Sequence, residues 1–135
     1  MKKTKILALL FPIIALILEL LPNGVAMRFA TPPGKQPFIT HTSYFDLLPF
    51  GYANFAPLFT AVLTIVILIV LLVYATNGNQ KLCKVVKIMS LVATIISLLP
   101  IFFSSYTVVG GFISISLFAE FLFMTFKKPA DTDKE

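Results

Sequence analysis

Two glutamates, Glu19 and Glu120, are the residues of this chain best placed to carry chemistry, because each lies inside a long apolar stretch. An ionisable side chain within a membrane helix is costly and is by default a candidate for proton or cation coupling. A neutral carboxyl group can instead donate a hydrogen bond to a neighbouring helix. Both interpretations remain open for both residues, and the interhelical hydrogen bond is the simpler one.

The two carboxyl groups are not expected to form one site. At ~1.5 Å rise per residue, Glu19 lies ~5 Å from one end of its segment and Glu120 ~10 Å from the end of its own, in opposite halves of a membrane. A catalytic acid and base must reach one reacting centre, which this separation prevents. Glu19 is close enough to the surface to be hydrated. The expected partners at matching depth are Thr60 for Glu19, and Ser90, Thr94 or Ser116 for Glu120.

The other reactive side chains stand alone. His41 is the only histidine and Cys83 the only cysteine, which excludes an intramolecular disulfide and a Cys-x-x-Cys redox site and leaves a metal site without ligands. The position of Cys83 near a helix end allows acylation as an alternative to a packing role. Neither a Gly-rich phosphate loop nor a nucleophile elbow occurs. We therefore expect no catalytic residue, no metal, no cofactor and no enzymatic activity.

The composition indicates that membrane-spanning helices hold these residues. The chain is 58% hydrophobic and only 13% charged. Residues 56–75 contain no charged side chain, and ~20 such residues cross a hydrocarbon core of ~30 Å. The net charge is +5, but the basic residues flank apolar segments and do not form one polar surface. We therefore expect the lipid bilayer as a partner and no nucleic acid.

We predict a single membrane domain over residues 1–135, an all-α, four-helix antiparallel transmembrane bundle. The parts are four spans at approximately 6–22, 56–75, 85–104 and 107–126, an external loop at 23–55 and a cytoplasmic tail at 127–135. A basic start, an apolar run and Gly24-Val25-Ala26 also fit a cleaved signal peptide over residues 1–26. We favour a retained first helix, because small, kinked and ionisable residues share one of its faces, as in helices that pack together: Ala8, Pro12, Ala15 and Glu19.

The external loop has the pattern of a β-hairpin. Val25–Thr31 and Phe38–Tyr44 are rich in β-branched and aromatic residues, and the prolines and glycine between them favour a turn. We expect this hairpin to lie on the membrane surface. A helical turn capped by Ser43 and stopped by Pro49 and Gly51 follows. The aromatic residues leading into the second span predict an interfacial anchor: Phe45, Phe50, Tyr52, Phe55 and Phe59.

The distribution of basic residues predicts the orientation. Nine of the eleven Lys and Arg residues fall on one side of the predicted spans, and only Arg28 and Lys35 fall on the other. Lys and Arg accumulate on the cytoplasmic side of membrane proteins. We therefore expect a multi-pass protein of the bacterial cytoplasmic membrane with both termini in the cytoplasm.

Small residues in the last two spans predict close helix packing. The spacing places three of them on one face of the third span and two on one face of the fourth: Ser90, Thr94, Ser97, Gly110 and Ser114. Such faces let helix backbones approach each other in lipid. They favour an accessory, regulatory or oligomer-forming protein, with a membrane-protein partner or a homo-oligomer. The alternative is a small transporter or channel in which Glu120 is the coupling residue.

The stretch from Ser43 to Pro57, Ser-Tyr-Phe-Asp-Leu-Leu-Pro-Phe-Gly-Tyr-Ala-Asn-Phe-Ala-Pro, carries a resemblance. It leads directly into the second predicted span. In this it resembles the corresponding stretch of a group of small uncharacterised four-span bacterial membrane proteins. The resemblance implies the fold and no particular activity.

Overall fold

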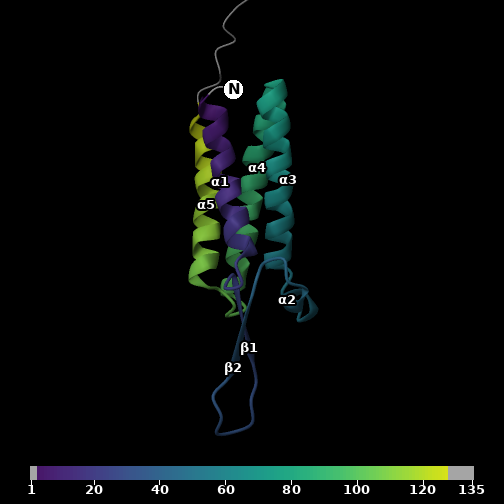
Figure 1. Cartoon of the computed structure of the whole chain (residues 1–135), viewed down its shortest axis with the longest axis vertical. Coiled ribbons are helices and arrows are strands. Elements are labelled where there is room, and N and C mark those ends of the chain that lie inside the picture. Colours follow the sequence, from purple (N-terminus) through teal and green to yellow (C-terminus); the bar gives the residue numbers. More distant parts are fainter. Residues whose placement is uncertain (1–2, 128–135) are drawn as a thin grey trace, which may run out of the picture.

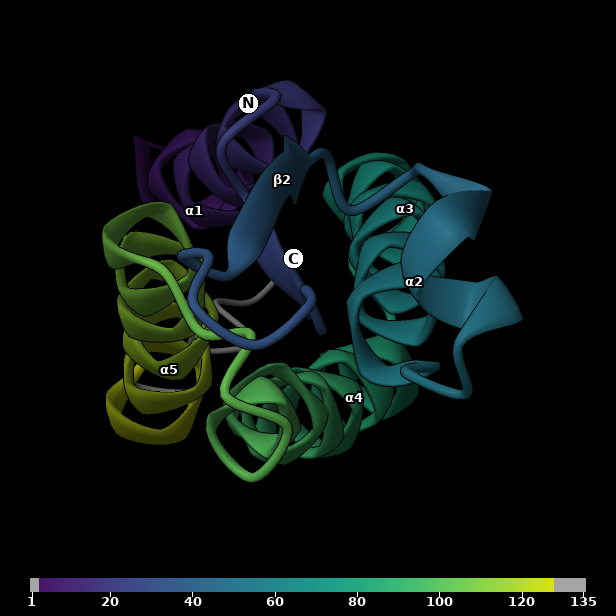
Figure 2. The same cartoon turned by 90° about the horizontal axis from the view of Figure 1, so that it is seen from below.

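Four long helices lie side by side in the computed structural model, which describes residues 3–127 (Figure 1). They are α1 (Lys3–Leu20), α3 (Ala56–Asn77), α4 (Gln80–Leu98) and α5 (Val108–Phe126), and a short 3-10 helix, η1 (Leu99–Ile101), extends α4. Each long helix packs against two others, α1 and α4 each contacting both α3 and α5. Seen from the end that carries the segment between α1 and α3, the four helices form a ring (Figure 2).

Three of these helices are long and apolar enough to cross a membrane: α3, α4 together with η1, and α5. Helix α1 is apolar in its centre, but it also contains Lys3, Lys5 and Glu19. The chain is therefore mostly helical with three candidate spans, and the fourth span remains a prediction.

Helix α4, which corresponds to the third predicted span, begins at Gln80 and thus earlier than the expected residue 85. The side chain of Asn79 accepts a hydrogen bond of 2.9 Å from the backbone N–H of Lys81 and so caps the helix. Gly78, at φ 66°, ends α3 just before it. This tight connection places Lys81 and Lys84 within α4 and not in a loop.

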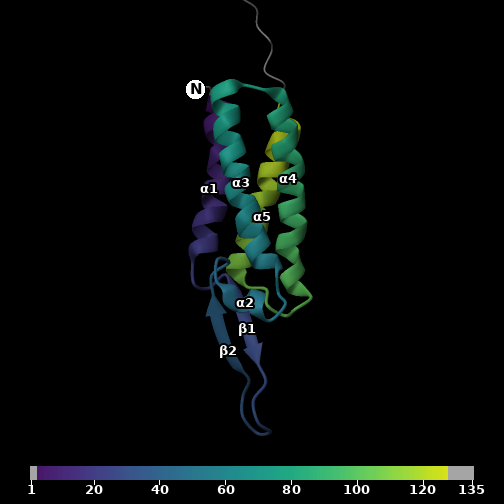
Figure 3. The ribbon, with the colours of Figure 1, turned by 90° about the vertical axis from the view of Figure 1, so that its right-hand side faces the viewer.

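The predicted β-hairpin is confirmed. Strand β1 (Val25–Phe29) pairs antiparallel with β2 (Phe38–Thr42), in a register that places Val25 opposite Thr42. The hairpin does not lie across the helix ends but extends along the direction of the helix axes (Figure 3). Its base is anchored, because Ala26 N–H donates to the Ser105 carbonyl at 3.1 Å and Tyr44 N–H to the Glu19 carbonyl at 3.0 Å.

The helical turn after the hairpin differs from the expectation in its cap. Helix α2 (Leu47–Gly51) is capped by Asp46, which accepts a hydrogen bond of 2.8 Å from Leu48 N–H, and not by Ser43. Pro49 lies inside the first turn and does not stop the helix, because backbone N–H groups there have no intrahelical acceptor to lose. Of the predicted tail at 127–135, only Lys127 belongs to the described residues.

Candidate functional site

Buried polar side chains lie between the four long helices. Glu19 from α1 and Glu120 from α5 are both fully buried. The buried hydroxyl groups that share the interior come from α3, α4 and α5: Thr60, Thr64, Ser90, Thr94, Ser97 and Ser114. A helix that faces lipid on one side and other helices on the other turns its polar groups towards the helices, where they can find partners.

Glu19 bonds to Thr64 and not to Thr60. Thr64 Oγ1 donates to Glu19 Oε1 at 2.7 Å, whereas Thr60 Oγ1 donates to the carbonyl of Ala56 at 2.8 Å. The prediction of Thr60 was wrong by one helical turn, because residue counting along two separate helices does not fix their axial offset. Glu19 is also buried instead of hydrated, and its Oε2 has no partner within residues 3–127.

Tyr44 covers Glu19 from the base of the hairpin. Its side chain is only 1% exposed and packs beside two glycines, Gly24 and Gly110. A Cβ atom at Gly24 would lie 2.8 Å from the Tyr44 ring, so only glycine leaves room for it. Burial, and then the nearby Glu19 and Tyr106, raise the pKa of Tyr44, so the phenol keeps its proton.

The small residues of the last two helices face each other across the interior. Ser97 Oγ lies 2.8 Å from Ser114 Oγ, and the Tyr106 hydroxyl donates to Ser114 Oγ at 3.1 Å. Thr94 Oγ1 donates to the carbonyl of Ser90 at 2.7 Å. With the buried Gly110, these residues lie inside the packed helices.

Glu120 has no hydrogen-bond partner among residues 3–127. Both of its carboxylate oxygens are buried without a donor from the part of the chain that the structure describes. Of the expected partners, the Thr94 hydroxyl donates to the carbonyl of Ser90, and the Ser116 hydroxyl donates to the carbonyl of Phe112. The hydroxyl of Ser90 itself has no hydrogen-bond partner within residues 3–127. A buried ionised carboxylate without partners is costly, so Glu120 requires a proton, a cation or water from outside the chain.

A cluster of two lysines and a tyrosine lies at the end of the helices opposite the hairpin. It was not predicted from the sequence. Lys127 Nζ donates to the Tyr74 hydroxyl at 2.9 Å and lies 4.5 Å from the centre of its ring, and Lys5 Nζ lies 5.3 Å from the same centre. Lys5 also donates to the carbonyl of Ala75 at 3.1 Å. Lys5 belongs to α1 and Tyr74 to α3, and Lys127 directly follows α5. The sequence indicated only that the two lysines flank apolar segments.

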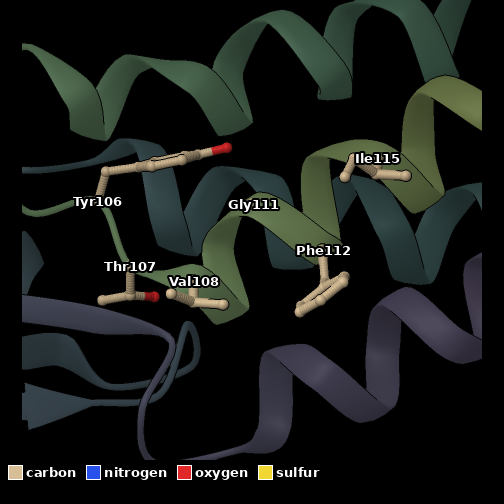
Figure 4. A pocket seen from close by; sticks show the side chains of 6 residues that line it. All are labelled: Tyr106, Thr107, Val108, Gly111, Phe112 and Ile115. Atoms are coloured by element: carbon tan, nitrogen blue, oxygen red, sulfur yellow. The ribbon is translucent and has the colours of Figure 1, made fainter.

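The surface grooves lie away from both glutamates. One, of about 480 Å³, is formed at the start of α5 by Tyr106, Thr107, Val108, Gly111, Phe112 and Ile115 (Figure 4). A second, of about 510 Å³, follows the contact between α4 and α5 and has almost entirely apolar walls. Among residues 3–127, no group of three or more His, Cys, Asp and Glu side chains could hold a metal ion.

Comparisons with models of protein families, with curated proteins and with solved structures find no match to this chain.

Proposed function

We propose that this chain is a non-enzymatic integral membrane protein of four spans in the bacterial cytoplasmic membrane, with both termini in the cytoplasm. Within it, Glu120 binds and releases a proton as the coupling residue of a small transporter or channel. The observation that carries the proposal is the fully buried carboxyl group of Glu120, whose two oxygens accept no hydrogen bond from residues 3–127.

The surroundings of Glu120 support a mobile proton more than a structural hydrogen bond. A carboxyl group retained for helix packing should have a partner on a neighbouring helix, as Glu19 has in Thr64. Ser90, also buried and unpartnered, belongs to the neighbouring helix α4. Two unpartnered polar groups inside the same helix assembly are expected where water or a proton enters transiently.

The same interior offers further groups for proton movement. Hydroxyl groups can both donate and accept, and those of Ser97, Ser114 and Tyr106 already form a connected network. This network lies towards the hairpin end, where Tyr44 covers Glu19. Buried carboxyl and hydroxyl groups of this kind are the groups that proton relays in membrane proteins use.

The test is proton flux into liposomes that contain the purified chain and the pH-sensitive dye pyranine. A potassium gradient with valinomycin supplies the driving voltage. The wild-type chain should acidify the vesicle interior faster than protein-free vesicles, and Glu120→Gln should reduce the rate to that of the empty vesicles. Gln preserves shape and hydrogen-bonding capacity but cannot exchange a proton. Circular dichroism of the variant checks that it is folded.

Ser116→Ala is the matched control, because Ser116 lies on the same helix and bonds only to its own backbone. It should conduct like the wild type. A wild-type rate equal to that of empty vesicles, or an undiminished rate in Glu120→Gln, would contradict the proposal.

Association with a partner protein is the second candidate function. It is favoured by the hairpin, which projects beyond the helices and exposes Phe38 and Ile39 at 62% and 45%. Among residues 3–127 each strand pairs with only one other, so the outer edges are open to a further strand except at Ala26, whose N–H donates to the Ser105 carbonyl. An accessory or regulatory subunit, or a homo-oligomer, would use this surface.

A further inference from the structure

Helices α1 and α5 lie side by side (Figure 1), and residues of both form an apolar groove near the ends that carry Lys5 and Lys127. It measures about 400 Å³ and is lined by Phe11, Ala119, Leu122, Phe123, Phe126 and Lys127. The rings of Phe11 and Phe123 contact each other with centroids 5.6 Å apart, and Phe126 is 78% exposed. Lys127 is the only charged residue of this lining.

The lysine end of the groove has unused hydrogen-bond donors. Lys5 and Lys127 each have three N–H groups, and each uses one of them within residues 3–127, on the Ala75 carbonyl and the Tyr74 hydroxyl. Neither forms an ion pair with a carboxylate of this part of the chain. Both ammonium groups lie against the same Tyr74 ring, so two positive charges are held close together.

We infer that this end of α1 and α5 binds an anionic phospholipid, with one acyl chain in the groove and the phosphate between Lys5 and Lys127. The occupant follows from charge complementarity, because an apolar channel that leads to two ammonium groups matches an acyl chain that leads to a phosphate. Basic pockets between membrane helices bind anionic headgroups in this way. The inference requires a membrane protein but does not depend on proton movement at Glu120.

Native mass spectrometry of the full chain, released from detergent micelles with equal amounts of phosphatidylglycerol and phosphatidylcholine of identical acyl chains, tests the site. The wild type should retain phosphatidylglycerol preferentially. The double variant Lys5→Gln, Lys127→Gln should lose roughly twenty-five-fold in this preference, at about fivefold for each lysine near the headgroup. The matched control Lys81→Gln, Lys84→Gln removes two exposed lysines from the same end of the helices and should keep the preference.

A second variant tests the groove without changing charge. Ala119→Phe fills it, because Ala119 is part of its wall, and should weaken retention of both lipids while leaving the lysines in place. Equal retention of the two lipids by the wild type would overturn the inference, as would an equal loss in the control pair. Displacement of phosphatidylglycerol by inorganic phosphate would indicate a site for a free anion, and a dimer that Ala119→Phe abolishes would indicate a protein contact. Either result would overturn the lipid site.

Discussion

The hydrogen bond from Thr64 to Glu19 joins two helices, and its removal should be measurable as a loss of stability. Thr64→Val keeps the side-chain volume but leaves Glu19 Oε1 without its donor at 2.7 Å. We expect a loss of about 0.6 to 1.7 kcal/mol, the range for interhelical hydrogen bonds in membrane proteins. The measurement is unfolding of the chain in mixed micelles by increasing SDS, followed by circular dichroism.

Thr60→Val is the matched control, because Thr60 is equally buried on the same helix and donates only to its own backbone. It should cost less than Thr64→Val, and Thr64→Ser should restore most of the wild-type stability. Equal costs for the two valine variants would show that the bond to Glu19 contributes nothing specific.

The two glutamates show how far the sequence could predict the site at this scale. Their apolar surroundings placed both within membrane helices, but Glu19 was expected to be hydrated, whereas both side chains are completely buried. Their partners could not be predicted, because contacts between helices depend on axial offset and rotation, which no pattern within one helix contains. Counting residues placed Thr60 opposite Glu19, whereas the packed helices place Thr64 there.

The base of the hairpin depends on a close approach between Gly24 and Tyr44. Gly24→Ala would place a Cβ atom 2.8 Å from the Tyr44 ring, so the ring or the strand must shift. We expect a destabilisation of about 1 to 3 kcal/mol, as for other overpacked sites. Hydrogen–deuterium exchange should show faster exchange of the amides of β1, which lie next to this contact.

Gly51→Ala serves as the control for this substitution. Gly51 lies in α2, and an added Cβ atom there would have no neighbour within 4 Å. Its effect on exchange in β1 should be negligible. Unchanged exchange in Gly24→Ala would mean that the base of the hairpin can adapt without loss.

The elements themselves were largely predictable from the sequence. Long apolar runs predicted the bounds of α3 and α5 to within two residues and those of α4 to within six, since runs of that length have few other structures open to them. The β-branched and aromatic residues on both sides of the prolines and Gly34 predicted the hairpin, although not its direction. That direction is set by anchors from distant parts of the chain, such as the Ser105 carbonyl and the Glu19 carbonyl.

For the whole molecule, single-cysteine labelling in a Cys83→Ser background tests the proposed four spans. A membrane-impermeant thiol reagent on intact cells should label cysteines at Lys35 and Phe102 and should not label those at Lys3 and Asn79. Phe102 is suitable because it is 84% exposed in the connection before α5. The expectation follows from the excess of basic residues on the side of Lys3 and Asn79.

Solubilised protein supplies the control, in which all four positions should react. Labelling of a cysteine at Asn79 on intact cells would show that the orientation is the reverse of the proposed one. A mature chain without the cysteine at position 3 would show that the first helix is a cleaved signal peptide, which would leave three spans and remove Lys5 and Glu19 from the mature protein.

The anchoring of the hairpin bears on how the covalent chain could be divided. Gly34, at the turn, has open space around it, and Thr31 bonds only to the carbonyls of Lys35 and Gln36 within that turn. The contacts that hold α1 in place lie at the other end of the hairpin and along the helices. The first helix with β1 and the rest of the chain are thus natural halves of a split protein, able to reassociate through packing after the backbone between them is cut.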